Sequence, residues 1–332
     1  MLLGLPSNTG IDPLAILLLA LALDAALGDP RWLSRVLPHP VVLIGRLIDL
    51  GERRLNDPTK RPSALIARGM ILTLAVVLLA IAVAGFLAGL LHWLPGGWLI
   101  EACLVAMLLA GRGLYDGVRS VAVGLEGGLA EGREAVSHLV GRDPTTLDEA
   151  GVARAALESL AENYSDGVVA PVFWYLLFGL PGIAAYKAIN TLDSMIGHRT
   201  PRYIAFGRVA ARLDDTVNWI PARLAGGLMV LAAAFPPWAD AKAAWQAMLR
   251  DAPKHRSMNA GWQEAALAGA LGFAIAGPRR YREEVVEDPW MGDGRRDLGP
   301  ADIRQGLRLY LWACGLPTAL LLLAWLLLAW LL

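Results

Sequence analysis

The final stretch of the chain is an uninterrupted apolar run, and it constrains the fold more than any other feature. It reads LYLWACGLPTALLLLAWLLLAWLL over residues 309–332 and contains no charged residue. A helix needs about 20 such residues to cross the hydrocarbon core of a bilayer. We therefore expect a C-terminal transmembrane helix at 309–332, and the rest of the chain must fold in a way that suits a membrane.

The overall composition supports a membrane protein. Of the 332 residues, 56% are hydrophobic, and the mean hydropathy is +0.47. This is more apolar than an ordinary soluble domain. The 30 basic and 30 acidic residues balance, so no nucleic-acid partner is expected. Cys103 and Cys314 both lie in apolar runs, where we interpret them as small buried hydrophobes rather than a disulfide or metal pair.

Several further apolar runs predict additional membrane helices. The region between the first two runs, residues 29–68, carries eight Lys or Arg against four Asp or Glu, which places it on the cytoplasmic side. The run at 168–186 is broken by FGLPG, a pattern that suits a re-entrant hairpin. Two shorter runs fit thin spans, a crossing pair or buried core helices. The predicted spans are 12–28, 69–92 and 98–112, and the two short runs are 224–238 and 264–277.

These patterns predict an all-α fold. We expect a polytopic helical bundle, with short or re-entrant helices around a cytoplasm-facing polar site. The whole chain, 1–332, is interpreted as one membrane-embedded domain. Residues 113–166 form a polar cytoplasmic helical insertion, and 278–308 is a second polar segment in which 288–299 is expected to be loop.

Carboxylates and amides gather beside apolar runs between residues 158 and 223. Ionisable groups near membrane depth are costly without partners and are functional candidates for that reason. Glu158, Glu162 and Asp166 recur at helical spacing and are expected on one face. Hard oxygen ligands of this kind suit Mg²⁺ bridged to a substrate phosphate. The alternative is a solvated acidic helix face balanced by nearby arginines.

Other polar residues in these segments allow two interpretations each. His39 can bind phosphate or simply cap a loop, and Arg199 can bind phosphate or anchor the chain at the membrane surface. Asn259 and Glu264 begin an apolar helix whose N-terminus can attract an anion or be capped in the ordinary way. Motifs of P-loop nucleotide binding, zinc proteases, α/β hydrolases and dinucleotide oxidoreductases are absent from the sequence.

Six segments, taken together and in order, resemble the adenosylcobinamide-phosphate synthase family of cobalamin biosynthesis, also called the CobD/CbiB family. One departure is Tyr164, where the family pattern ENTSDG leads us to expect threonine. The segments are LGDP at Leu27–Pro30, HPV at His39–Val41, ENYSDGVVAPVFW at Glu162–Trp174, YKAINTLDSMIGH at Tyr186–His198, FGRVAARLDDTVNWIPARL at Phe206–Leu224 and HRSMNAGWQEAALAGALG at His255–Gly272.

The resemblance implies an integral-membrane, carbon–nitrogen (amide-forming) ligase of the inner (cytoplasmic) membrane, multi-pass, with its active site on the cytoplasmic side. Such an enzyme joins adenosylcobyric acid to aminopropanol or aminopropanol O-phosphate, using ATP as co-substrate and Mg²⁺. The product is adenosylcobinamide or its phosphate. Besides these substrates and the lipid bilayer, other late cobalamin-assembly enzymes are expected partners.

Within that reaction the candidate residues take three roles. Carboxylates hold Mg²⁺ directly or through water, amides and cations bind phosphate or corrin amides, and a histidine takes the proton of the attacking amine. The metal set is Glu162, Asp166, Asp193, Asp214 and Asp215. The binding set is His39, Asn163, Asn190, Ser194, Arg199, Asn218, Arg223 and Asn259, and the catalytic set is His198, His255 and Glu264.

Two rival functions remain open from the residues alone. An intramembrane prenyl or alcohol-phosphate transferase also uses Asp-rich helices with Mg²⁺ and pyrophosphate, although this chain has a single Asp-Asp pair. A transporter or scaffold predicts related halves, which the sequence does not show.

Overall fold

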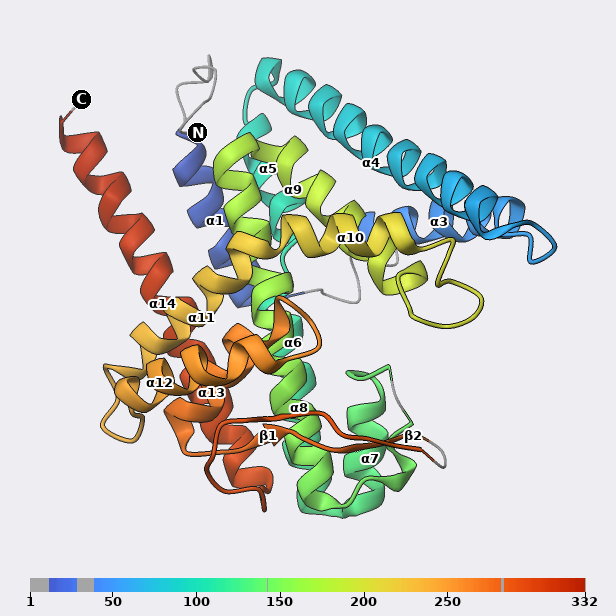
Figure 1. Cartoon of the computed structure of the whole chain (residues 1–332). Helices are drawn as coiled ribbons and strands as arrows, with labels where there is room; N and C mark the ends of the chain where they lie inside the picture. The colour runs from blue at the N-terminus through green and yellow to red at the C-terminus, as the bar shows by residue number, and fades with distance from the viewer. Residues whose placement is uncertain (1–11, 29–38, 142, 282–283, 332) are drawn as a thin grey trace. The chain divides into compact units, whose positions relative to one another are not determined.

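The computed structural model describes residues 12–28, 39–141, 143–281 and 284–331. Helices dominate these residues, and the strands among them are four very short ones, so the predicted all-α class is confirmed (Figure 1). The chain divides into two compact units, each with its own internal packing. Unit 1 comprises 1–110, 170–218 and 325–332, and unit 2 comprises 111–169 and 219–324.

Among the described residues, four helical segments are long and apolar enough to cross a membrane. They are Pro62–Trp93, Gly97–Gly127, Glu149–Ile196 and Pro300–Leu331. The predicted span 69–92 falls within the first of these, and the described part of the predicted span 309–332, up to residue 331, falls within the last. The helix Pro13–Leu27 is shorter, with 15 residues. The multi-pass helical class expected from composition is therefore present in the structure.

The described residues of unit 1 form six helices besides the last residues of α14 (Pro300–Leu331). They are α1 (Pro13–Leu27), α3 (Pro40–Leu55), α4 (Pro62–Trp93), α5 (Gly97–Ala106), α9 (Ala170–Ile196) and α10 (Arg208–Val217). The segment 29–68, expected as a loop between spans, therefore contains α3 and the start of α4. Residues 29–38 and part of the LGDP segment lie outside the described residues.

The core of unit 1 lies where α3, α4, α9 and α10 meet, around Ile48, Leu72 and Phe206. Two glycines allow the backbones to approach closely there. A Cβ at Gly69 would collide with the carbonyl oxygen of Phe206, and one at Gly207 with that of Ile196. This packing fixes the C-terminal half of α9 against α10.

Helix α9 bends at the predicted FGLPG break. Gly179 has φ 64° and ψ −150°, which a residue with a side chain rarely adopts, and Pro181 follows. Trp174 stacks on Phe178 before the bend, with ring centroids 5.8 Å apart. The break is confirmed, and whether it makes a re-entrant hairpin in a bilayer stays a prediction.

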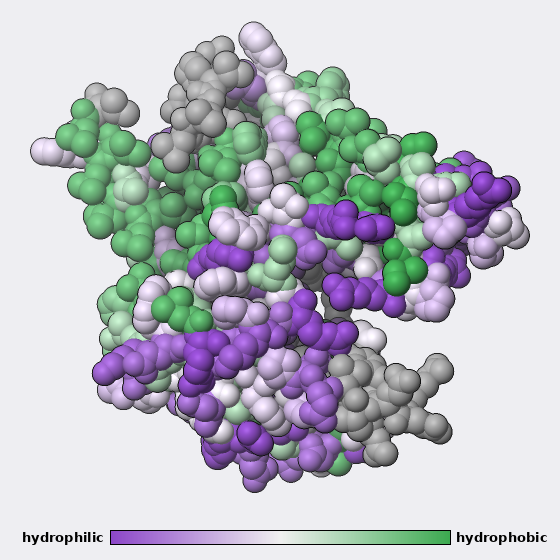
Figure 2. Space-filling model, viewed as in Figure 1, coloured by the Kyte–Doolittle hydropathy of each residue, from purple (hydrophilic) through white to green (hydrophobic). Residues whose placement is uncertain are grey.

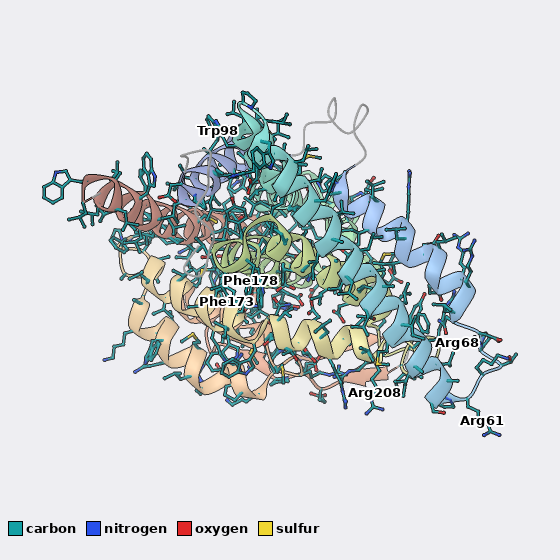
Figure 3. The ribbon with its side chains drawn as sticks, turned by 90° about the horizontal axis from the view of Figure 1, so that it is seen from above. Arg61, Arg68, Trp98, Phe173, Phe178 and Arg208 are labelled. Carbon is teal, nitrogen blue, oxygen red and sulfur yellow. The ribbon has the colours of Figure 1, made fainter. Side chains whose placement is uncertain are left out.

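The two ends of α4 differ in chemistry. Arg61 and Arg68 lie at its beginning, and Trp98 lies beyond its far end (Figure 3). Hydrophobic side chains gather along α4 and along α14, whereas the loop before α4 is hydrophilic (Figure 2). Cationic and aromatic residues at opposite helix ends are typical of a segment that crosses a membrane.

Unit 2 is built around α13 (Ala260–Leu271), which is buried along almost its entire length. Its Ala- and Gly-rich sequence lets the neighbouring helices approach closely: a Cβ at Gly269 would lie 2.6 Å from the Cβ of Ala247. Of the alternatives left open for the run 264–277, the structure shows a buried core helix as far as Leu271, and the rest of the run is not helical. The other helices of unit 2 are α6 (Gly111–Gly127), α7 (Leu129–Ser137), α8 (Glu149–Tyr164), α11 (Trp219–Ala233), α12 (Ala241–Asp251) and α14 (Pro300–Leu331), with one π-helical turn, η2 (Ser165–Val169), and two 3-10 turns, η1 (Pro144–Thr146) and η3 (Ala252–Lys254).

Short antiparallel strands, which were not expected, occur at the end of the run 264–277 and in the polar segment that follows it. Strand β1 (Ile275–Ala276) pairs with β4 (Trp290–Met291), and β2 (Arg279–Tyr281) pairs with β3 (Glu284–Val286). The loop prediction for 288–299 is therefore wrong at 290–291. It failed because a two-residue strand carries no periodic sequence signal.

Candidate functional site

Polar side chains of α9 and α10 meet inside unit 1. The Nδ2 of Asn190 donates to Oδ1 of Asp214 at 3.5 Å, and the Nδ2 of Asn218 donates to Oδ2 at 3.0 Å. The hydroxyl of Tyr186 donates to Oδ1 of Asn218 at 2.9 Å. Together with the nearby Asp193, these residues form what we call the carboxylate–amide cluster.

Two carboxylates of this cluster lie close enough to repel each other. Burial raises the pKa of Asp214 to about 7, and the charge of Asp193 contributes to that rise, against the lowering effect of the two amides. Among the described residues, no ion pair is formed with either carboxylate. The cluster therefore favours binding of a proton or a cation.

The donor chemistry of the cluster fits Mg²⁺, which prefers carboxylate and amide oxygens and keeps several waters. A cation there would relieve the repulsion that raises the pKa of Asp214. No three His, Cys, Asp or Glu side chains lie within reach of a common metal in the described part of the chain. A metal ion at this cluster stays a prediction, and Asp193 and Asp214 are the two carboxylates that would hold it.

Asp215 lies on the same helix as Asp214 but in a different environment. Burial raises its pKa, and the positive charge of Arg199 offsets part of that rise. Arg199 itself is exposed after the end of α9. This arrangement puts a cation beside the cluster without an ion pair to Asp193 or Asp214, a suitable position from which to contact a phosphate.

The segment between α9 and α10 carries the remaining candidates of unit 1. His198 is exposed, lies close enough to Asp193 to interact with its charge, and has its ring 6.3 Å from that of Tyr203. The hydroxyl of Ser194 donates to the backbone oxygen of Asn190 at 2.9 Å, which is an ordinary helix-surface bond. Its predicted contact with substrate stays a prediction.

His39, also in unit 1, is the N-cap of α3. Its Nδ1 accepts a hydrogen bond from the backbone nitrogen of Val41 at 3.3 Å. The capping interpretation of this histidine is therefore confirmed, and a contact with phosphate stays a prediction.

The acidic face predicted on α8 belongs to unit 2, and its members differ from one another. Glu158 is buried and accepts a hydrogen bond from the backbone nitrogen of Ala276 at 3.0 Å, which is a structural role. Glu162 is exposed, and Asp166 lies in the π-helical turn η2. The Nδ2 of Asn163 donates to the backbone oxygen of Ser159 at 3.0 Å. The π turn changes the helical register that the spacing argument assumed.

Tyr164, the departure from the family pattern, packs into the core of unit 2. Its hydroxyl donates to the backbone oxygen of Ala313 at 2.7 Å, and its ring meets that of Tyr310 edge-on with centroids 5.7 Å apart. The bulky side chain is therefore a packing residue between α8 and α14.

Arg223, predicted to clamp phosphate, is held between two indole rings of unit 2. Its guanidinium lies 4.2 Å from the ring centroid of Trp219 and 4.6 Å from that of Trp262. It donates to the backbone oxygen of Trp219 at 2.7 Å and to Oδ1 of Asn259 at 3.5 Å. Both Arg223 and Asn259 thus have structural partners, and their contact with substrate stays a prediction.

The predicted residues His255 and Glu264 face each other. The Nε2 of His255 lies 3.6 Å from Oε2 of Glu264, and its Nδ1 accepts from the backbone nitrogen of Ser257 at 3.0 Å. Glu264 is buried in the first turns of α13. Both ring nitrogens of His255 thus face groups of the protein itself, so its predicted role as a general base stays a prediction.

The five predicted metal ligands are therefore divided between the units. Asp193, Asp214 and Asp215 lie in unit 1, and Glu162 and Asp166 lie in unit 2. The prediction that all five share one ion remains a prediction. In unit 1, hydrogen bonds join Asn190, Asp214 and Asn218 to one another, and Asp193 lies near enough to affect Asp214 through its charge.

Two features were missed by sequence reasoning. Tyr186 looked like part of an apolar helix, and its hydrogen bond to Asn218 becomes visible only when α9 and α10 are packed together. Glu52 is buried and binds Arg202 through both carboxylate oxygens, at 2.8 and 3.0 Å from Nη2. This pair ties α3 to the segment that carries His198, and 150 residues separate its members.

Comparison with known proteins gives the family. Residues 17–310 match the family model described as CobD/Cbib protein. A cobalamin biosynthesis protein CobD from Brucella suis biovar 1 is 50% identical over 315 residues, which is 94% of this chain and 96% of that protein.

Two further relatives agree with this match. The proteins of the same name from Rhizobium meliloti and Rhodobacter capsulatus are 48% identical over 309 residues and 49% identical over 300 residues. These matches cover 92% and 89% of this chain, and 94% and 92% of the relatives. No solved structure matches the chain. The chain belongs to the CobD/CbiB family.

Proposed function

We propose that this chain acts in cobalamin biosynthesis as the ligase that joins adenosylcobyric acid to aminopropanol or its O-phosphate. Family membership supports the pathway, because the relatives are named cobalamin biosynthesis proteins. The carboxylate–amide cluster of unit 1 supports the chemistry. The observation that carries the proposal is the pair of neighbouring acids, Asp193 and Asp214, without an ion-pair partner among the described residues.

Amide formation from a carboxylate requires that one of its oxygens become a leaving group. We propose that ATP supplies it: the corrinoid carboxylate attacks the γ-phosphate, ADP leaves, and an acyl phosphate forms. The amine then attacks the acyl carbon, inorganic phosphate leaves, and a proton is released from nitrogen. Each step needs anions to be held together, so charge compensation and positioning account for most of the catalysis.

The residues of unit 1 divide these tasks. Mg²⁺, held by Asp193 and Asp214, would supply positive charge to offset the phosphates. Arg199 would contact a phosphate oxygen through its planar fork. His198, which is exposed beside Asp193, would accept the proton of the amine. In unit 2, His255 and Glu264 are the alternative candidates for accepting this proton.

The proposal is tested by turnover in membranes that contain the full chain. Adenosylcobyric acid is incubated with each amine, with and without ATP and Mg²⁺, for the wild type, Asp193→Ala and Asp214→Ala. Losing a group that stabilises developing charge is expected to reduce the rate about 10²-fold or more. Asp49→Ala is the control, because Asp49 is an acid of the same unit that pairs with Arg53 at the surface.

Activity within about threefold of wild type in both cluster variants would remove Asp193 and Asp214 from the site. A comparison of the two amines tests Arg199 separately. If the phosphorylated amine reacts no faster than the free amine, the proposed phosphate contact is wrong. Turnover of a labelled prenyl diphosphate instead of the corrinoid would favour the transferase alternative.

A further inference from the structure

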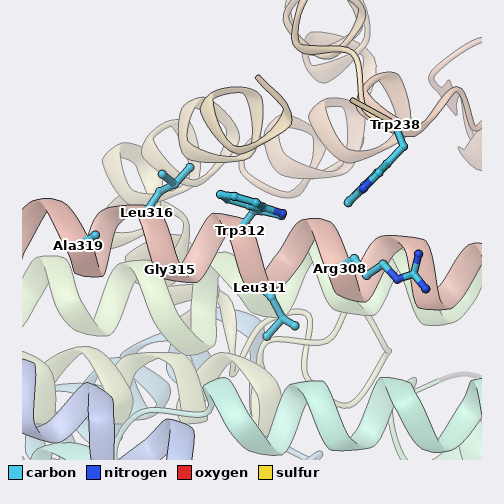
Figure 4. A pocket seen from close by; sticks show the side chains of 7 residues that line it. All are labelled: Trp238, Arg308, Leu311, Trp312, Gly315, Leu316 and Ala319. Carbon is cyan, nitrogen blue, oxygen red and sulfur yellow. The ribbon is translucent and has the colours of Figure 1, made fainter. Parts of the chain in front are cut away.

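Helix α14 carries a hollow on its surface within unit 2. The hollow has a volume of about 510 Å³ and is formed against the turn between α11 and α12 (Figure 4). Nearly all its lining is apolar, and Arg308 is the exception. The lining residues are Trp238, Arg308, Leu311, Trp312, Gly315, Leu316 and Ala319.

Contacts between α14 and the chain after α11 fix the walls of the hollow. The Nε2 of Gln305 donates to the backbone oxygen of Trp238 at 3.4 Å. Phe235 stacks on Trp312, with ring centroids 5.7 Å apart and planes 12° from parallel. Gly315 also lines the hollow, and a Cβ added there would meet nothing within 4 Å. Specific contacts therefore hold the walls of the hollow in place, and open space remains above Gly315.

A second hollow of about 310 Å³ adjoins the first and shares Trp238 and Arg308 with it. It is more polar, because Arg304 and Gln305 also line it. The Nη2 of Arg304 donates to Oε2 of Glu126 at 2.6 Å, so its charge is balanced. Arg308 is exposed and forms no hydrogen bond or ion pair within the described part of the chain. The polar end therefore has an uncompensated positive charge.

We propose that the two hollows bind one anionic phospholipid, with its phosphate at Arg308 and an acyl chain along Trp312 and Leu316. Three observations support this occupant. The first hollow lies on a helix long and apolar enough to span a membrane. Tryptophan and arginine side chains are typical of the depth at which lipid headgroups lie. The charge of Arg308 complements a negative headgroup.

Native mass spectrometry of the full chain in neutral detergent tests this site. The probes are phosphatidylglycerol and phosphatidylcholine with the same acyl chains, and glycerol phosphate serves as the headgroup without chains. We expect one phosphatidylglycerol to be retained at least about fivefold more strongly than phosphatidylcholine, as one cation near a headgroup predicts. Arg308→Gln should remove this preference, and Arg308→Lys should keep most of it.

A variant that fills the hollow tests the acyl-chain half independently. Gly315→Leu adds a side chain into open space in a helix, so folding should be kept while the bound lipid is lost. Gly89→Leu is the matched control, because Gly89 is also a helical glycine with nothing within 4 Å of its added Cβ. It should retain the lipid.

The proposal is overturned if the wild type holds both lipids equally, or if Arg308→Gln and Gly315→Leu both retain phosphatidylglycerol as the wild type does. Displacement of the lipid by glycerol phosphate at equal concentration would show a site for small phosphates instead. Melting temperatures of all variants within a few degrees of wild type exclude misfolding as the cause of lost binding.

Discussion

Replacing Asp214 with asparagine removes a buried carboxyl whose pKa is raised to about 7 from the ordinary 3.8. Burial is the main cause, and the neighbouring Asp193 adds to it. Asparagine keeps the shape of the side chain, but its single oxygen can replace only one of the two carboxylate oxygens that accept from the amides of Asn190 and Asn218. The variant therefore changes the titration of the cluster with little change to its packing.

The direction in which the free energy of unfolding changes with pH follows from the proton that Asp214 binds. Between about pH 4 and pH 7 the folded chain keeps a proton on Asp214 that the unfolded chain has released. The free energy of unfolding therefore falls as pH rises through this window. With a folded pKa of about 7, the fall between pH 5.5 and 7.5 is about 2 kcal/mol, since one pKa unit corresponds to about 1.4 kcal/mol.

The assay is thermal unfolding of the purified chain in detergent, without divalent ions, at several pH values in this range. The wild type should melt lower at pH 7.5 than at pH 5.5, by roughly 4 °C. Asp214→Asn should lack this contribution. Adding Mg²⁺ should raise the melting temperature of the wild type more at pH 7.5, because the ion competes with the proton.

The reasoning fails if wild type and Asp214→Asn show the same pH dependence. It also fails if Mg²⁺ stabilises the two proteins equally, because the ion would then bind elsewhere. Asp49→Asn is the matched control: Asp49 is an acid of the same unit that pairs with Arg53 at the surface, so this variant should behave as the wild type.

Three other substitutions give separate tests. Gly197→Ala should lower turnover tenfold or more, because its Cβ would collide with Oδ1 of Asp193 and displace the carboxylate. The same Cβ would lie 2.7 Å from the backbone oxygen of Asp193, so the melting temperature is measured as well to separate lost catalysis from lost folding. Glu52→Gln should cost about 1 to 2 kcal/mol of stability, measured by thermal unfolding, since it weakens a buried acceptor of Arg202. Burial raises the pKa of Asp251, but hydrogen bonds from its cationic neighbours lower it to about 2. The stability that Asp251 contributes is present above about pH 4 and is lost as the pH falls toward 2. Asp251→Asn should lower the free energy of unfolding at neutral pH by only about 1 to 2 kcal/mol, because solvent partly screens the half-exposed cations that pair with Asp251.

Each of these predictions has a contradicting outcome. Normal turnover in Gly197→Ala would mean that the position of Asp193 is unimportant. An unchanged melting temperature in Glu52→Gln would show that the pair with Arg202 adds no stability. Equal acid sensitivity of wild type and Asp251→Asn would assign the low-pH transition to other carboxylates.

The long apolar runs were predictable because length and hydropathy alone decide whether a helix can span a bilayer. Residues 69–92 and the described residues 309–331 illustrate this, and each range falls within a longer helix. The bend near residue 179 was also predictable, because Gly-Pro sequences interrupt helices locally. In contrast, the burial of α13 depends on its neighbours, and an Ala-rich run of its length fits several environments.

Some features of the candidate site could likewise be predicted from the sequence, and others could not. Asn190, Asp193, Asp214 and Asn218 were identified because oxygen-bearing side chains stand out beside apolar sequence. The network that joins three of them to Tyr186 could not be deduced, since it depends on how α9 packs on α10. The single acidic face expected on α8 assumed a regular helix, and the π turn after Tyr164 breaks that assumption.

Titration of the purified chain with Mn²⁺, followed by electron paramagnetic resonance, tests the central claim most directly, because free and bound ions give different signals. The account predicts a bound ion that Mg²⁺ displaces, that weakens as pH falls below about 7, and that is lost in Asp193→Asn and Asp214→Asn. Undiminished Mn²⁺ binding in both variants would contradict it.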